Sequence, residues 1–232
     1  MVVSYPHAKK ENMNHKEYLK QYAIIRFDKN FSKVENLYNH NLSIMGSLTF
    51  LKFEILNCLI LDFNNASITL TNHFVERMLK LSLILIETKN LTLSEPDKYS
   101  KKVNHLHQQY DHLYLHETLN HNKKKKLISE EEYKYLNNEG KMFRDSYSHA
   151  QIGKINNEQP DNFSGQMFSF SDVKEKLTKG ESNFTTRKIE IPSISPSVVP
   201  LYQNISAEKN ALIYFTKVYE ILINIEKRLE EI

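Results

Sequence analysis

Residues 68–89 read ITLTNHFVERMLKLSLILIETK, and this stretch decides the fold. Large apolar side chains recur in it every three or four positions, at Leu70, Phe74, Met78, Leu81 and Leu85. That spacing puts them on one face of an α-helix, so the stretch predicts a long helix with a broad buried face. Residues 47–64, just before it, are denser in apolar side chains and predict a second central helix, buried on much of its surface.

Weaker helical patterns surround this central pair. Residues 14–38 and 207–230 carry apolar side chains at helical period and predict one helix near each end of the chain. Residues 99–121 also have a helical pattern, although they are more polar and rich in histidine. Ser129, with Glu132 three positions later, forms a capping-box pattern that predicts the start of another helix.

Three short segments predict the breaks between these helices. Asn64 to Ser67 supplies turn and cap residues between the two central helices. The segment Leu93 to Asp97 contains a proline and predicts a second break. Asn137 to Gly140 ends in glycine and predicts the end of the helix that Ser129 opens, with the following residues opening the next helix.

Residues 157–204 differ in character from the rest of the chain. Serine and asparagine are frequent there, together with Pro160, Gly165, Gly180, Pro192, Pro196 and Pro200. Two short runs, 167–170 and 188–191, have β-propensity and indicate a hairpin. We therefore expect a single all-α domain over residues 1–232, a helical bundle with an irregular insertion at 157–204 before the last helix.

Composition narrows the class of protein. The chain has 232 residues, 40% of them hydrophobic, with only 5 Gly and 6 Pro, which favours long helices over a many-turned β-sandwich. Its one cysteine, Cys58, lies in an apolar run, which predicts a buried thiol and fits a reducing compartment. We find no signal-peptide pattern and no apolar run long enough to span a membrane, so we expect a cytoplasmic protein. The net charge of +3 is too small to indicate a nucleic-acid binder without a local basic patch.

The chemically suggestive segment is Arg144-Asp145-Ser146-Tyr147-Ser148-His149. Arginine presents a fork of donors that fits a phosphate, and histidine transfers protons near neutral pH. Asp145 and His149 are four residues apart and share a helix face, whereas Arg144 and His149 are roughly 140° apart around a regular helix. The latter pair can converge if Arg144 lies in a first helical turn or the bend before it, or if two copies of the chain meet. Arginine–aspartate pairs and exposed histidines are also common on ordinary helices.

These six residues resemble the motif of the HEPN superfamily, which is arginine, a polar residue, three further residues and histidine within a small helical bundle. Residues 74–81, FVERMLKL, are also similar to a second-helix segment found in that superfamily. The resemblance covers the helical parts of the chain and not residues 157–204. It implies a metal-independent and cofactor-free endoribonuclease, a toxin or antiviral effector, that cleaves single-stranded RNA. It further implies a homodimer with a composite active site and a 2′,3′-cyclic phosphate product.

The resemblance also assigns roles to residues. Arg144 would bind and polarise the scissile phosphate, His149 would act as general acid or base, and Asp145 would orient His149 or hold Arg144. An antitoxin or regulatory partner is a further expectation. A toxin subclass of the superfamily has tyrosine two places after the histidine, where its antitoxin attaches nucleotides. Gln151 stands at that position and argues against an antitoxin of that kind.

Two further clusters have competing interpretations. Lys123, Lys124, Lys125 and Lys126 would attract RNA phosphates, with Ser148 beside Arg144 as a further RNA contact, or they form a solvated loop. Three histidines of residues 105–121 would line one face of a single helix and bind zinc or iron, but a solvated face is the favoured interpretation and we expect no metal. The rival to the nuclease is a non-catalytic helical module that binds RNA or a protein partner, with a structural motif.

Overall fold

The computed structural model of the chain describes residues 14–89, 91, 96–148, 161–180, 186–193, 195–196 and 198–231. Its elements in chain order are α1 (His15–Asn39), the short 3₁₀ turn η1 (Gly46–Leu48), α2 (Thr49–Ile60), α3 (Asn64–Thr88), α4 (Pro96–Asp111), α5 (Leu115–Lys124), α6 (Glu130–Tyr135), η2 (Leu136–Gly140), α7 (Lys141–Phe143), η3 (Arg144–Ser148), β1 (Asn162–Phe168), α8 (Phe170–Thr178), β2 (Thr186–Pro192) and α9 (Val199–Glu231). The expected all-α bundle with a small hairpin insertion is confirmed.

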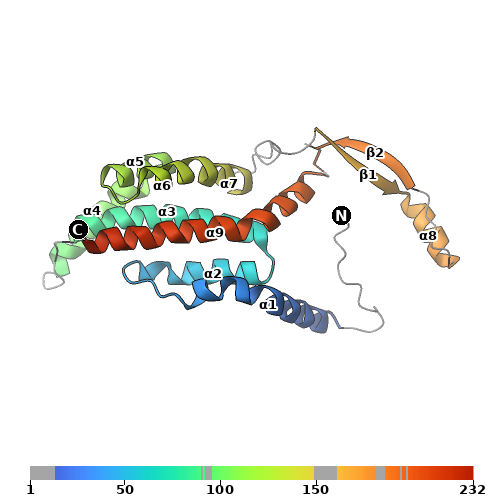
Figure 1. The fold of residues 1–232 in the computed structure, drawn as a ribbon, viewed down its shortest axis with the longest axis horizontal. Coiled ribbons are helices and arrows are strands. Elements are labelled where there is room, and N and C mark those ends of the chain that lie inside the picture. Colours follow the sequence, from blue (N-terminus) through green and yellow to red (C-terminus); the bar gives the residue numbers. More distant parts are fainter. Residues whose placement is uncertain are drawn as a thin grey trace.

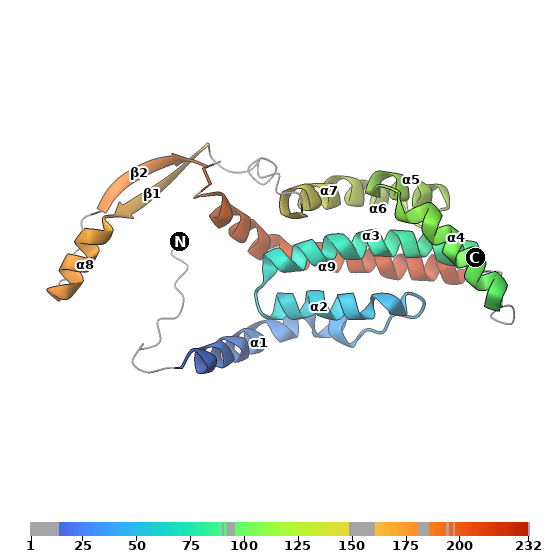
Figure 2. The same ribbon diagram turned by 180° about the vertical axis from the view of Figure 1, so that it is seen from behind.

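The bundle has three layers (Figures 1 and 2). Helices α3 and α9 lie side by side in the middle layer, with α1 and α2 on one side and α5, α6 and α7 on the other. Phe74 of α3 and Phe215 of α9 meet edge to face, with ring centroids 5.8 Å apart, and both side chains are fully buried. The apolar stripe of residues 68–89 therefore forms the centre of the core, as its period predicts.

The insertion forms an arm that extends beyond the bundle at the start of α9 (Figure 1). Strands β1 and β2 pair antiparallel, from Asn162 opposite Pro192 to Phe168 opposite Thr186, and α8 lies between them in the chain. The predicted hairpin therefore exists. However, β1 begins and ends earlier than residues 167–170, and a helix follows it where the hairpin pattern suggests a turn.

Three predicted helix boundaries are wrong. Asn64 to Ser67 forms the first turn of α3, and the chain reverses just before it, where Asp62 has a φ of 59°. Helix α9 begins at Val199 instead of residue 207, because Pro200 falls in the first turn, where its missing N–H group costs nothing. The helix expected over 99–121 is two helices, α4 and α5, separated between Asp111 and Leu115. Residues 93–95 of the predicted second break lie outside the described residues, and Pro96 opens α4.

The capping box is confirmed, but the helix that it opens does not end at Gly140. Ser129 Oγ accepts from the backbone N–H of Glu132, and the Glu132 carboxylate accepts from the backbone N–H of Ser129. From Glu130 the chain stays helical to Ser148 through two π-helical turns, η2 and η3. Gly140 has φ −60° and ψ −40°, which is ordinary helical backbone. The nearest side-chain atom to a Cβ built at this position is the hydroxyl of buried Tyr214, at 3.7 Å, so the glycine neither breaks the helix nor is required by a close contact.

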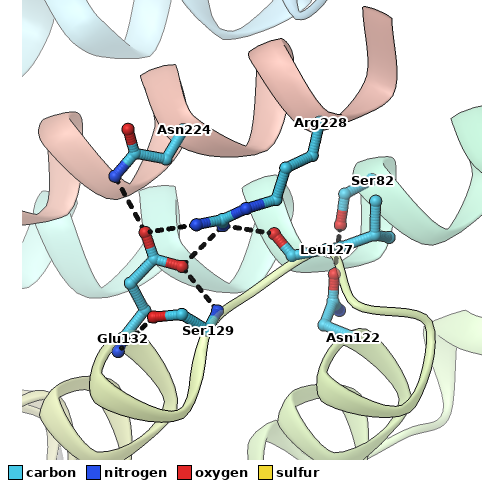
Figure 3. Close-up of polar contacts among 7 residues, drawn as sticks. All are labelled: Ser82, Asn122, Leu127, Ser129, Glu132, Asn224 and Arg228. Atoms are coloured by element: carbon cyan, nitrogen blue, oxygen red, sulfur yellow. Dashed lines mark hydrogen bonds and ion pairs between the residues drawn. The ribbon is translucent and has the colours of Figure 1, made fainter. Parts of the chain in front are cut away.

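A buried polar network attaches this helical run to α9 (Figure 3). Arg228 donates through Nη1 to Glu132 Oε2 at 2.6 Å and to the Leu127 carbonyl at 2.8 Å, and Asn224 donates to Glu132 Oε1 at 2.8 Å. Burial of the Glu132 carboxyl tends to raise its pKa, but the donors from Arg228, Ser129 and Asn224 outweigh burial and hold the pKa below its ordinary value. The network therefore fixes the start of the run whose other end is the Arg144 segment.

Candidate functional site

Arg144 lies at the far end of this run, where η3 packs on α3. Its guanidinium has carboxylates on two sides, with Nη1 4.0 Å from Glu76 Oε1 and Nη2 3.7 Å from Asp145 Oδ1. Both distances exceed that of a hydrogen bond. Nε is buried and has no hydrogen-bond partner among the described residues, while the side chain as a whole is 24% exposed. The guanidinium is thus oriented by charge and retains donor capacity.

A chain of hydrogen bonds runs beside Arg144. The Tyr214 hydroxyl donates to Asn72 Oδ1 at 2.9 Å, and Asn72 Nδ2 donates to Ser148 Oγ at 3.0 Å. Tyr214 also packs against Phe143, with ring centroids 4.4 Å apart and the ring planes tilted by 34°, and its deep burial raises the pKa of its phenol. This chain connects α9 and α3 to the exposed Ser148 at the end of η3. It holds the motif segment against the middle layer of the bundle.

A narrow crevice separates the two layers at this point. Its lining residues come from four different parts of the fold and are Asn72, Val75, Leu115, Gly140, Arg144 and Tyr214. Leu115 is the first residue of α5, so the layer that carries the motif also contributes Leu115 to the lining. The crevice has no room for a water molecule, so it is a packing seam that supports Arg144 and does not itself hold a ligand. An anion would instead meet the exposed part of the Arg144 side chain, whose guanidinium suits a phosphate.

The structure constrains the motif only in part, because His149 and Gln151 lie outside the described residues. Arg144 is not in a first helical turn or a preceding bend, so that route to its convergence with His149 is wrong. The segment is also not a regular α-helix. In a π-helical turn the hydrogen bonds reach five residues, so the α-helical angle of roughly 140° does not apply within η3.

The neighbouring motif residues are placed clearly. Asp145 is 5% exposed, and its Oδ1 lies 3.7 Å from Arg144 Nη2, while the other partner expected for it, His149, lies outside the described residues. Phe143 is buried, and the Tyr147 hydroxyl donates to the Gln203 carbonyl at 3.1 Å. Burial raises the pKa of Tyr147, so its phenol stays protonated. Tyr147 is therefore a packing residue.

The four lysines do not join this site. Lys123 pairs with Glu130 at 2.7 Å and lies over the Tyr133 ring, and Lys125 pairs with Glu87, whose pKa it lowers chiefly through their hydrogen bond. Lys124 and Lys126 are exposed. All four lie at or after the end of α5, about 12 Å or more along the helix axis from Leu115 in the crevice. Two of the four charges are therefore neutralised, and the run forms no patch with Arg144.

The histidines are also dispersed. The break after Asp111 puts His105 and His107 on α4 and His116 and His121 on α5, so no single helix face carries three of them. Within the described part of the chain, no group of three or more His, Cys, Asp or Glu side chains could hold a metal ion. Cys58 is partly buried, and both burial and the nearby Glu54 raise the pKa of its thiol, which disfavours a reactive thiolate.

Sequence reasoning missed three residues of the site. Glu76 stands four residues before Lys80, a spacing that favours an ion pair along α3, but it faces Arg144, while Lys80 donates to the Asp111 carbonyl at 2.8 Å. Asn72 carries a detectable signal, since it is a polar residue within the apolar helix 68–89 and is 5% exposed. Tyr214 has no such signal, because its hydroxyl acquires a role only where α9 meets α3.

Comparison of the chain with known protein families, curated proteins and solved structures finds no match. Among the helices that the structure describes, each is too short or too polar to cross a bilayer.

Proposed function

We propose that this protein is a metal-independent endoribonuclease of the HEPN type that cleaves single-stranded RNA as a homodimer and acts as a toxin or anti-phage effector. The observation that carries the proposal is the state of Arg144. Its guanidinium is oriented between Glu76 and Asp145 without a close hydrogen bond to either, and it remains partly exposed. A phosphate within hydrogen-bond distance would bind the guanidinium more strongly than either carboxylate does at its present distance. The oxygens of a phosphate also fit the fork of donors that arginine presents.

The reaction needs two proton transfers. A base takes the proton of a ribose 2′-hydroxyl, whose oxygen attacks the phosphorus, and the bond from phosphorus to the 5′-oxygen breaks while an acid protonates the leaving oxygen. The products are a 2′,3′-cyclic phosphate and a 5′-hydroxyl. In the proposal, Arg144 stabilises the charge on the phosphate and His149 transfers protons.

A second copy of the chain completes the proposed site. One protomer supplies one His149, whereas the reaction uses both a base and an acid, so two copies of the motif supply both groups. Asp145 keeps Arg144 in place, a role supported by its burial beside the guanidinium.

The deciding experiment compares RNA cleavage by the wild type and by His149→Ala in the presence of a metal chelator. We expect the wild type to cleave and the variant to lose about 100- to 10,000-fold in rate, with the helical content unchanged. Lys124→Ala, which removes an exposed charge far from Arg144, is the matched control and should cleave like the wild type. Equal cleavage by wild type and His149→Ala would overturn the proposal, and equal host toxicity of the two on expression would do so independently.

The second candidate is a non-catalytic helical module that binds a protein partner. The observation that favours it is a group of large apolar side chains on α1 that stay exposed in the monomer, Leu19, Ile24, Ile25 and Phe27. Such a surface is typical of a protein interface. A protein that binds a partner through α1 but leaves RNA intact in both wild type and His149→Ala would support this candidate over the nuclease.

A further inference from the structure

A second cavity lies between α3, the end of α4 and the turn η1. Its volume is about 280 Å³, near the lower end of the range for small-molecule sites. Three elements from different parts of the chain form it, and its lining residues are Ser47, Leu48, Arg77, Lys80, Leu81, Ile84, His107 and Asp111. The apolar side chains are buried or half-buried and form the floor, while the charged groups stand at the rim.

The two cations differ in how they are held. Lys80 is half-buried, and its ammonium donates to the Asp111 carbonyl at 2.8 Å, which fixes the nitrogen and leaves two protons for another acceptor. Arg77 is exposed and makes no hydrogen bond or ion pair with the described residues, so its full fork is available. The cavity therefore combines one fixed point charge with one free bidentate donor.

Asp111 adds a negative charge but does not cancel these cations. Its Oδ1 lies 3.8 Å from His107 Nδ1, so the carboxylate faces the imidazole. Even with His107 neutral, the cavity holds one positive charge in excess. An anion placed between Arg77 and Lys80 thus meets a net positive field above an apolar floor.

We propose that this cavity binds the phosphoryl group of a small phosphorylated ligand, with Arg77 and Lys80 holding the phosphate and the floor of Leu48, Leu81 and Ile84 taking an apolar or aromatic group. The chemistry is that of a phosphate monoester such as a nucleoside monophosphate. An RNA phosphodiester offers the same anion, so the two sources have to be distinguished. The inference does not depend on the nuclease, because it concerns a different cavity and is tested by binding.

The position of the cavity gives it a relation to the Arg144 site. Lys80 lies four residues after Glu76 on the same side of α3, about 6 Å along the helix axis. A phosphate held at Lys80 is therefore one helical turn from the carboxylate that faces Arg144. The two sites are neighbours on a single rigid helix.

The test is calorimetric titration of the full chain with 5′-adenylate, with inorganic phosphate and with a short oligoribonucleotide that lacks terminal phosphates. We expect adenylate to bind more tightly than phosphate, and Arg77→Gln to weaken both by about 10- to 100-fold, because it removes a charged hydrogen-bond pair. Lys101→Gln, on a different face of α4 from His107, is the matched control and should bind like the wild type.

Each outcome has a definite meaning. Arg77-dependent binding of adenylate supports a small phosphorylated ligand, and Arg77-dependent binding of the oligonucleotide alone assigns the phosphate to RNA and overturns that ligand class. Undetectable binding of all three probes, or equal affinities in wild type and Arg77→Gln, overturns the site altogether. Arg77 is exposed, so its variant should melt like the wild type, and loss of binding then reports the lost contact.

Discussion

The carboxylate of Glu76 on α3 faces the guanidinium of Arg144 on η3 at 4.0 Å, and this pair joins the motif to the middle layer. The distance is too long for a hydrogen bond, and the Glu76 side chain is 42% exposed. Glu76 therefore orients Arg144 weakly and can be displaced by a stronger acceptor. A phosphate that approaches Arg144 has to compete with this carboxylate.

Replacing Glu76 with glutamine should strengthen RNA binding. The change removes a negative charge beside Arg144, and exposed pairs of this kind are worth about 0.2–1 kcal/mol, so affinity should rise by up to about fivefold at low salt. The measurement is RNA affinity at two salt concentrations in a His149→Ala background, which prevents the proposed cleavage. Glu54→Gln, on α2, serves as the control. A loss of affinity in Glu76→Gln would mean that Glu76 positions Arg144 and does not compete with substrate.

Breaking the ion pair of Arg228 and Glu132 should be costly. Arg228→Met leaves a carboxylate that is 9% exposed without its cation, and we expect about 3 kcal/mol of lost stability, the low end for buried pairs because Arg228 is 28% exposed. Lys217→Met breaks an exposed pair on the same helix and should cost less than about 1 kcal/mol. Urea unfolding of both variants measures the difference.

The double variant Arg228→Met Glu132→Gln separates charge from packing. It removes the uncompensated carboxylate, so it should be more stable than Arg228→Met alone. A double variant that is less stable than the single one would show that the loss comes from packing and the Leu127 carbonyl.

Acid should destabilise the protein through the same network. The pKa of Glu132 is lower in the folded state than its ordinary value of 4.5, so its contribution to stability is complete above that pH and is lost as the pH falls through the folded pKa. Glu87, whose pKa is lowered by Lys125, acts in the same direction. The free energy of unfolding, measured from pH 7 down to about pH 3, should fall below pH 4.5, and less steeply in Glu132→Gln. A slope that is unchanged in Glu132→Gln would contradict this assignment.

The hydroxyl of Tyr214 should contribute measurably to stability. Tyr214→Phe keeps the ring packed against Phe143 and removes only the donor to Asn72 Oδ1, which should cost about 1 kcal/mol because that oxygen is left buried. Tyr38→Phe is the control, since its hydroxyl makes no hydrogen bond with the described residues, and it should change stability by less than about 0.5 kcal/mol. Equal thermal midpoints for both variants would mean that the chain of hydrogen bonds from Tyr214 to Ser148 contributes nothing to the stability of the fold.

Local patterns predicted the parts of the fold that depend on neighbours in the chain. The spacing of the apolar residues Phe74 and Met78 predicts α3, because it places both side chains on one face of a helix whatever that face packs against. Both side chains are fully buried. Ser129 predicts a helix start because its partner, Glu132, is three residues away. Arg144 was identified from its motif. Its surroundings were not, because Glu76 and Tyr214 reach it only when helices distant in the chain pack together.

The same reason explains the errors. Lys123 and Lys125 form a basic run in the sequence, but Glu130 and Glu87 neutralise them after the chain folds back. A long helix over 99–121 is consistent with local propensity, whereas the break after Asp111 puts Leu115 at the start of α5, where it lines the same crevice as Arg144. Glycine at position 140 indicates a helix end only when its backbone leaves the helical region, and its φ of −60° and ψ of −40° stay within that region.

Gly140 therefore offers a direct test of this interpretation. A Cβ at position 140 would lie 3.7 Å from the Tyr214 hydroxyl, which is ordinary van der Waals contact, and the backbone is already helical. Gly140→Ala should accordingly stabilise the protein by about 0.4–1 kcal/mol, since alanine has less backbone entropy to lose on folding. Gly180→Ala is the opposite control, because its φ of 71° strains any side chain, and it should destabilise. If Gly140→Ala destabilised the protein instead, the helical run from Glu130 to Ser148 would need glycine at its centre, and the close contact with Tyr214 would be the constraint that places Arg144.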